Sequence, residues 1–220
     1  MRIVLNGTPA DTEFKSTSEL LNGMCPGGIA VVNSFTADAD IELSEGDSVF
    51  ILNKDHIPSE KEADLLMSAR DPSRIRSKLR SASIGIAGLG GLGSNIAAML
   101  VRSGIGRLVI SDMDTVDATN LNRQNYFYDD LGRPKTDATE DLLKRISPCT
   151  EIEKHQCRLT PENIPDIYGN CDIVCEALDS AEEKAMFINT VLEKCLDTII
   201  ISGLGMAGHG HSNSITTKNG

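Results

Sequence analysis

The stretch from residue 83 to residue 124 constrains the fold more than any other part of the chain. Ser83–Ala87 is a short apolar run, which is typical of a buried strand. A glycine-rich turn at residues 88–93 follows, and apolar residues then recur at helical spacing until Gly104, which suits a helix stop. A second strand is predicted at Leu108–Ser111. This order predicts an α/β fold with a doubly wound, mostly parallel sheet of the Rossmann type.

The glycine turn fits the pattern G-x-G-x-x-G, and its place between a strand and a helix favours a nucleotide site over an ordinary tight turn. Its glycines let the backbone approach a phosphate without a Cβ in the way, and the helix start offers free N–H groups. The glycines concerned are Gly88, Gly90, Gly91 and Gly93. Asp112, after the second strand, is placed to accept hydrogen bonds from ribose hydroxyls. The alternative for Asp112 is a strand-end acid that faces water.

Polar and cationic residues follow the acid in quick order: Asn120, Arg123, Gln124 and Lys135. A dinucleotide dehydrogenase needs only the glycines and the acid. Cationic groups downstream of the ribose acid suit a triphosphate better than a nicotinamide, since they offset its extra negative charge. A nicotinamide dehydrogenase nevertheless stays among the alternatives.

The rest of the chain alternates between predicted helices and strands, as a parallel sheet with right-handed crossovers requires. The strand at Cys171–Leu178 is strongly apolar and ends at Asp179, where a parallel strand delivers functional residues. Cys171 and Cys175 are expected on one face of this strand. The other predicted elements are helices at Pro134–Ile146, at Pro161–Ile167 and from Ser180 to about Lys194, and strands at Glu151–Leu159 and Thr198–Ser202.

The first 60 residues predict a separate small unit in the order ββαββ. Strands are expected at Met1–Asn6 and Ala10–Phe14, and Ser16 can cap a short helix. Two further strands are expected at Ile29–Asn33 and at the end of Leu43–Ile51. A small β-rich appendage that only stabilises the chain is the alternative to a functional module.

Five ordered motifs in residues 70 to 215 resemble the ThiF/MoeB adenylyltransferases, relatives of the ubiquitin-activating enzymes. They are GLGGLGS at residues 88–94, DMDTV at 112–116, NLNRQ at 120–124, GRPK at 132–135 and LDS at 178–180. The resemblance implies an enzyme that uses ATP and Mg²⁺ to adenylate the C-terminal carboxylate of a ubiquitin-like sulfur carrier protein, first of all in thiamine biosynthesis. It also implies a homodimer.

The resemblance assigns a role to each candidate residue. Asn120 and Gln124 would line the ribose and phosphate wall, while Arg123 and Lys135 would contact phosphates during catalysis. Asp179 would bind Mg²⁺, with helix capping or an inter-strand contact as its alternative. Related enzymes also supply an arginine from before the first strand across the dimer, and the candidates here are Arg70 and Arg74, for which solvated helix-face arginines are the alternative. A solvated lysine is the alternative for Lys135.

Residues 1 to 55 resemble ThiS-like sulfur carriers of the ubiquitin-like β-grasp fold, through the ending LSEGDSVFI at 43–51. A carrier ends in a mobile Gly-Gly carboxylate, whereas this segment runs on into NKDHIPS at 53–59. The unit would therefore be a docking, lid or dimer element and not a substrate. The predicted division is a β-grasp domain at 1–58, a linker and helix at 59–80, and an ATP-binding domain at 81–220.

Composition excludes several function classes. The net charge of −11 makes nucleic acid an unlikely partner, and neither a signal peptide nor an apolar run of about 18 residues is present, so a cytoplasmic protein without membrane contact is expected. The six cysteines form no C-x-x-C pair, so no zinc is expected. Relatives usually continue for several strands beyond Gly220, so the chain is naturally short, truncated or completed by a partner.

Two further hypotheses about the function stay open. The phrase RSGIG at residues 102–106, with NRQ at 122–124, also occurs in the related ATP-dependent tRNA threonylcarbamoyladenosine dehydratases. The acidic charge and the fused β-grasp unit weaken that reading. The other is a non-catalytic ATP-binding scaffold whose β-grasp unit occupies the carrier groove.

Overall fold

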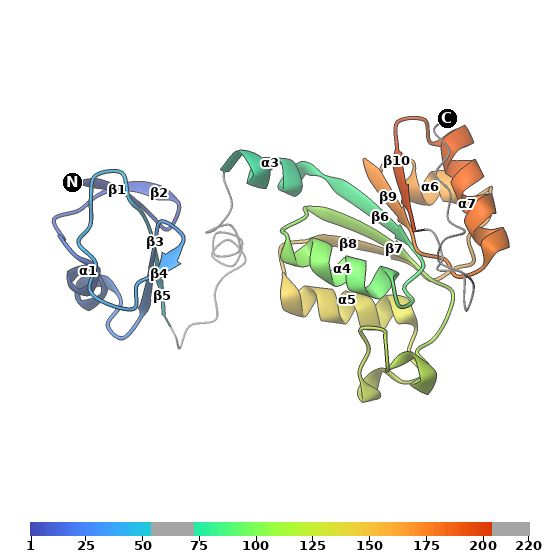
Figure 1. Cartoon of the computed structure of the whole chain (residues 1–220), viewed down its shortest axis with the longest axis horizontal. Coiled ribbons are helices and arrows are strands. Elements are labelled where there is room, and N and C mark those ends of the chain that lie inside the picture. Colours follow the sequence, from blue (N-terminus) through green and yellow to red (C-terminus); the bar gives the residue numbers. More distant parts are fainter. Residues whose placement is uncertain (54–72, 204–220) are drawn as a thin grey trace, which may run out of the picture.

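The computed structural model describes residues 1–53 and 73–203, and within helix α3 it describes side chains from Ser77 onward. Two five-stranded sheets are present in these ranges, one in each (Figure 1). No helix in the described part of the chain is long and apolar enough to cross a bilayer. The predicted helix at residues 60–70 lies outside the described residues.

The N-terminal sheet has the strand order β2-β1-β5-β3-β4, with β1 and β5 parallel at its centre. One helix, α1 (Thr17–Met24), packs on it and is capped by Ser16, whose Oγ accepts a hydrogen bond from Glu19 N at 3.3 Å. Leu20 of this helix lies in a core with Ile3, Val32, Leu43 and Val49. The strands are β1 (Arg2–Leu5), β2 (Thr8–Asp11), β3 (Ile29–Val32), β4 (Phe35–Thr36) and β5 (Ser48–Leu52).

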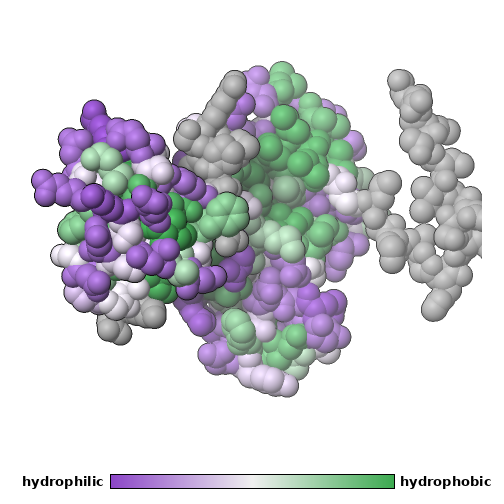
Figure 2. Space-filling model, turned by 60° about the vertical axis from the view of Figure 1, so that its left-hand side comes forward, coloured by the Kyte–Doolittle hydropathy of each residue, from purple (hydrophilic) through white to green (hydrophobic). Residues whose placement is uncertain are grey.

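The predicted β-grasp order is confirmed, with a short extra strand, β4, that the sequence did not indicate. The hairpin partner of β1 begins earlier than expected, at Thr8, because Asn6 and Gly7 adopt positive φ and make a tight turn. The face of this domain seen in Figure 2 is largely hydrophilic. This agrees with residues 1–60, which hold three basic and ten acidic residues.

The second sheet is entirely parallel, with the order β10-β9-β6-β7-β8. The chain starts in the middle at β6, builds outward through β7 and β8, and then returns to the other side for β9 and β10. This confirms the predicted doubly wound fold and places its switch point between β6 and β9. The strands are β6 (Ser83–Ala87), β7 (Arg107–Ser111), β8 (Glu151–His155), β9 (Ile173–Glu176) and β10 (Ile199–Ser202).

Helices cover both faces of this sheet (Figure 1). On one face α4 (Gly93–Arg102) and α5 (Lys135–Ile146) pack around Ile86 and Leu108, and α3 (Ser73–Ser81) contributes Leu79 to the same core. On the other face α6 (Ile164–Tyr168) and α7 (Ala181–Lys194) pack around Val109 and Val174. Successive residues along the central strands point alternately into the two cores, as Leu108 and Val109 do.

Helix α3 (Ser73–Ser81) falls at the end of the segment predicted as a linker and helix, 59–80. Two predicted strand ends were wrong. The strands predicted to reach Leu159 and Leu178 end at His155 and Glu176, where the chain turns toward the helices.

The expectation that Cys171 and Cys175 share a face is also wrong. Strand β9 begins only at Ile173, so period-2 alternation does not extend back to Cys171. Cys171 packs in the core of α6 and α7, whereas Cys175 packs in the core of α4 and α5.

Gly85, in the middle of β6, lies directly under the ring of Tyr168. A Cβ at this position would stand 2.5 Å from Tyr168 Cδ1. The tyrosine is fully buried, and its hydroxyl lies 2.5 Å from Ser111 Oγ and donates to Ile86 O at 3.0 Å. The missing side chain of Gly85 therefore lets α6 pack tightly against the sheet beside the end of β7.

We expect Gly85→Ala to lower the free energy of unfolding by about 1–3 kcal/mol, because the added methyl overpacks a core that cannot move a fully buried ring. Urea denaturation measures the change. Gly90→Ala is the matched control, since a Cβ there meets no atom closer than 4.0 Å. Equal stability of the two variants would contradict the prediction.

Candidate functional site

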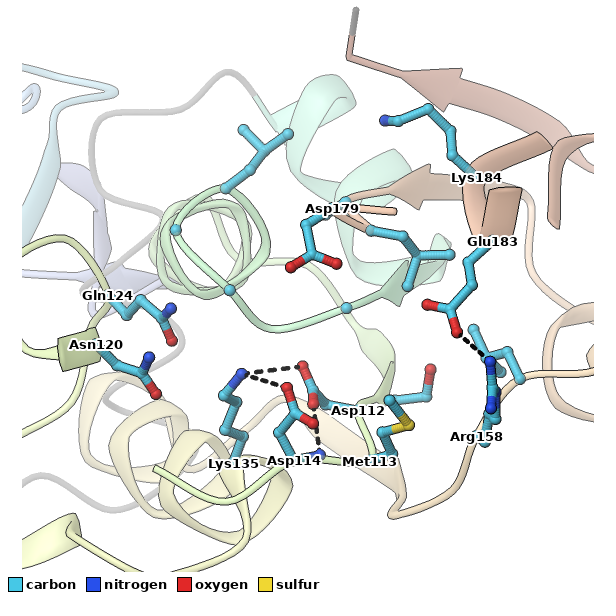
Figure 3. Close-up of a pocket in the computed structure, with 18 of the residues that line it drawn as sticks. Asp112, Met113, Asp114, Asn120, Gln124, Lys135, Arg158, Asp179, Glu183 and Lys184 are labelled. Carbon is cyan, nitrogen blue, oxygen red and sulfur yellow. Dashed lines mark hydrogen bonds and ion pairs between the residues drawn. The ribbon is translucent and has the colours of Figure 1, made fainter. Parts of the chain in front are cut away.

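A cavity of about 480 Å³ opens at the carboxyl ends of β6, β7 and β9, where the strand order reverses (Figure 3). Open α/β sheets bind ligands at this position, because the loops on the two sides of the switch point separate there. Eight of the predicted residues line it: Gly88, Gly90, Gly91, Asp112, Asn120, Arg123, Gln124 and Lys135. Asp179 joins them from the other side of the switch point.

The glycines of the turn are of two kinds: two are required by the backbone conformation, and two leave space beside the cavity. Gly88 has φ +91°, and a Cβ on Gly93 would stand 1.8 Å from Gly88 O, so these two are required by the backbone itself. Gly90 and Gly91 instead face open space, with Gln124 Nε2 at 4.0 Å and Arg123 Cγ at 3.6 Å the nearest atoms to an added Cβ. Within the described residues, the backbone N–H groups of Gly90 and Gly91 donate to no backbone carbonyl. They are thus available to an anion in the cavity.

Asp112 holds the turn and the following loop together. One carboxylate oxygen accepts from Leu89 N at 2.7 Å, and the other accepts from Asp114 N at 2.8 Å. Burial raises the pKa of Asp112 above its usual range, while these hydrogen bonds and Lys135 act in the opposite direction. The alternative of an acid facing bulk water is therefore wrong, since the side chain is only 9% exposed.

Lys135 begins α5 and points back toward Asp112. Its Nζ lies 3.0 Å from Asp114 Oδ2 and 3.9 Å from Asp112 Oδ2, with 6% of the residue exposed (Figure 3). The alternative of a solvated lysine is wrong. A buried ammonium held between two carboxylates is a fixed positive charge at the cavity wall, and contact with a phosphate stays a prediction.

Asn120, Arg123 and Gln124 form the wall nearest the glycine turn. The Arg123 side chain is exposed, and one of its terminal nitrogens donates to Thr119 O at 2.9 Å. Gln124 is 9% exposed, and its buried Oε1 has no hydrogen-bond partner among the residues that the structure describes. A buried acceptor without a partner is costly, so Gln124 Oε1 marks a place where a ligand or water completes the site.

Asp179 is exposed at the start of the loop after β9, and it points into the cavity (Figure 3). It does not cap α7, because Ser180 is the N-cap and its Oγ accepts from Glu183 N at 3.4 Å. Among the described residues no group of three or more His, Cys, Asp or Glu is placed to hold a metal ion. One carboxylate nevertheless fits Mg²⁺ brought in by substrate phosphates, since Mg²⁺ usually takes only one or two protein carboxylates there.

A buried ion pair behind Asp179 was not predicted. Glu176 is fully buried at the end of β9, and it accepts from Lys184 Nζ at 2.5 Å, Ser202 Oγ at 2.6 Å and Leu178 N at 2.7 Å. Lys184 also donates to Gly203 O at 3.0 Å. The network fixes the loop that carries Asp179 to the ends of both β9 and β10. The sequence did hold a signal for this pair, namely one acid, Glu176, inside an otherwise apolar strand. A buried acid of this kind requires a charged or hydrogen-bonding partner.

A second pair, Arg158 and Glu183, was also missed. Arg158 Nη2 donates to Glu183 Oε1 at 2.9 Å, and both residues line the end of the cavity opposite Lys135 (Figure 3). Arg158 follows β8 and Glu183 lies in the first turn of α7. The two residues are 25 positions apart in the sequence, so no local sequence pattern predicted the pair.

Two predicted features are not placed by the structure. Arg74 lies in α3, but its side chain is outside the described part, and Arg70 falls among residues 54–72, which are not described.

Comparison with known proteins decides the family. The sequence profile of the ThiF family matches residues 64–220. The chain belongs to the ThiF family. The profile of ThiS-like ubiquitin proteins matches residues 1–55.

Curated relatives include a sulfur carrier protein adenylyltransferase of Thermus thermophilus, 36% identical over 47% of this chain and 38% of the relative. A tRNA threonylcarbamoyladenosine dehydratase of Haemophilus influenzae is 35% identical over 58% of this chain and 50% of the relative. The chain thus spans half or less of each.

Among solved structures, the E. coli tRNA threonylcarbamoyladenosine dehydratase TcdA superposes with a TM-score of 0.62 at 25% identity. The superposition covers 70% of this chain and 64% of TcdA. A complex of TcdA with ATP superposes with a TM-score of 0.60 at 26% identity, over 67% of this chain and 60% of the other.

We expect Lys184→Met to lower the free energy of unfolding by about 3 kcal/mol, because it leaves the Glu176 carboxylate buried without its counter-charge. Lys184 is 24% exposed, so we take the lower end of the usual range. Urea denaturation compares this variant with Lys184→Arg, which keeps the charge and should lose less. A loss below about 0.5 kcal/mol for Lys184→Met would contradict a structural role for the pair.

Proposed function

We propose that this ThiF-family chain is an ATP- and Mg²⁺-dependent adenylyltransferase that activates the C-terminal carboxylate of a ubiquitin-like sulfur carrier. The proposal places it in the cytoplasm, as a homodimer, with thiamine biosynthesis as the first pathway to test. The observation that carries it is one cavity in which an open glycine turn, Arg123, Lys135 and Asp179 surround Asp112.

The chemistry required is in-line attack of a carboxylate oxygen on the α-phosphorus of ATP. An acyl–adenylate bond forms, the bond to the bridging oxygen breaks, and pyrophosphate leaves with the electron pair. The nucleophile is already ionised at pH 7, so no general base is needed. Two anions must meet, so the site has to neutralise charge and align the reacting atoms.

The residues present supply both functions. Asp112 orients the ribose through its carboxylate, which stays in one place because two backbone N–H groups hold it. Lys135 and the planar fork of Arg123 face the phosphates, and the N–H groups of Gly90 and Gly91 bind non-bridging oxygens. Asp179 would hold Mg²⁺, which would offset part of the negative charge of the phosphates.

The N-terminal domain is not the substrate in this proposal. Strand β5 ends at Leu52 and the chain continues toward the second sheet, so no free Gly-Gly carboxylate follows it. A docking, lid or dimer role remains. In a homodimer, Arg70 or Arg74 would reach the phosphates of the other subunit.

A tRNA-modifying dehydratase is the second candidate, favoured by the superposition on TcdA and by the relative from Haemophilus influenzae. The acidic charge opposes it, because tRNA binding depends on cationic contacts with the phosphate backbone. A tRNA gel shift at low salt separates the two candidates. A specific shift would favour the dehydratase.

We expect ATP–pyrophosphate exchange that depends on a ThiS-type carrier, and we expect Arg123→Ala and Asp179→Ala each to slow it by about a hundredfold. Both side chains are exposed, so the fold should tolerate the changes. Arg145→Ala, an exposed arginine on α5, is the matched control and should exchange at the wild-type rate. ATP binding without exchange with any carrier would replace the proposal with the scaffold reading.

A further inference from the structure

The cavity has two ends of different chemistry, with Asp112 between them (Figure 3). One end holds the glycine turn, Lys135 and the unpartnered amide oxygen of Gln124. At the opposite end Met113 lies beside Arg158 (Figure 3), and the cavity lining also includes Cys157, Leu159 and Met186. Lys184 also lines the cavity on this side, but its Nζ is already bonded to Glu176 Oε2 and Gly203 O. This end therefore suits a flat, weakly polar group better than a phosphate.

Arg158 and Glu183 close this second end. They approach from separate elements, the loop after β8 and the first turn of α7, and meet through the 2.9 Å contact. Glu183 is 25% exposed and Arg158 is 70% exposed. The acid is therefore the fixed partner, and the arginine is the part that extends over the mouth.

The pair adds little to stability. Exposed ion pairs of this kind contribute on the order of 1 kcal/mol or less, because solvent screens them and long side chains lose entropy. The effect of the ion pair is to hold the Arg158 guanidinium in one position. A guanidinium held by one edge keeps its planar face free, and such a face stacks well on aromatic rings.

We propose that Arg158 covers the nucleobase of the bound nucleotide and that Glu183 is the residue that positions it. This rests on the proposed function for the identity of the nucleotide, ATP. With the ribose at Asp112 and the phosphates beside the glycine turn and Lys135, the base extends to the opposite end. Arg158 stacks over its outer face, and Met113 and Leu159 line the surface beneath.

The test compares two ligands that share phosphates but not a base. The wild-type chain and its variants are titrated by calorimetry with α,β-methylene-ATP, which is not cleaved, and with inorganic tripolyphosphate. Arg158→Ala should weaken binding of the nucleotide about tenfold and leave tripolyphosphate binding within about twofold. Lys135→Met should weaken both ligands.

Three further variants sharpen the assignment. Arg158→Lys keeps the charge without the planar fork, so it should weaken nucleotide binding nearly as much as Arg158→Ala. Glu183→Gln should weaken nucleotide binding by an intermediate factor of about three, because the planar guanidinium of Arg158 remains but its ion pair with the carboxylate is lost. Arg145→Ala should match the wild type for both ligands. In exchange assays Arg158→Ala should raise the KM for ATP and leave kcat nearly unchanged.

Equal weakening of both ligands by Arg158→Ala would overturn the proposal, because the residue would then act as a general cation for phosphates. Unchanged nucleotide binding would overturn it too. Either result leaves ATP binding by the wild type, and hence the proposed function, intact. Failure of the wild type to bind the nucleotide at all would remove the proposed function as well.

Discussion

The Asp112 carboxylate is the interaction on which the cavity depends. It joins the glycine turn, the loop after β7 and the start of α5. Leu89 N and Asp114 N donate hydrogen bonds to it, and Lys135 supplies a positive charge. Burial alone would favour its protonated form, so the N–H groups and the ammonium are what make an ionised acid tenable there. The same contacts set the distance between the glycine turn and α5. The acid proposed to bind ribose thus also holds the glycine turn and the start of α5 together.

Much of this half of the site was predictable because it is local. The glycine turn and Asp112 belong to a strand–turn–helix–strand unit whose geometry follows from spacing in the sequence, and Lys135 begins the next α-helix, α5. Glu176 with Lys184 and Arg158 with Glu183 were missed because each pair forms only when separate strands and helices meet. The misplaced Cys171 has the same origin, since its face depends on where β9 begins, and that is decided by the turn from α6.

The residues that line the cavity come from the two halves of the sheet on either side of the switch point. The glycine turn, Asp112 and Lys135 come from the β6–β7–α5 side, whereas Asp179, Glu183 and Lys184 come from the β9–α7 side. A bound nucleotide would span both. The Glu176–Lys184 network ties the Asp179 loop to β9 and β10. In the proposed function this would hold the loop in place for phosphates and Mg²⁺.

In the proposed function the residues around this cavity act on the nucleotide, and they do not decide which group attacks it. A carrier carboxylate and a modified tRNA base are both activated by adenylation chemistry, so the choice between them depends on surfaces outside the pocket. Residues 1–60 carry ten acidic and three basic residues. The face of residues 1–53 seen in Figure 2 is mostly hydrophilic, with smaller apolar areas. A polyanion such as tRNA gains little from such a surface, because its affinity rests on releasing counterions to lysine and arginine. A protein partner with cationic patches does gain, which is why charge, more than fold similarity, favours the carrier.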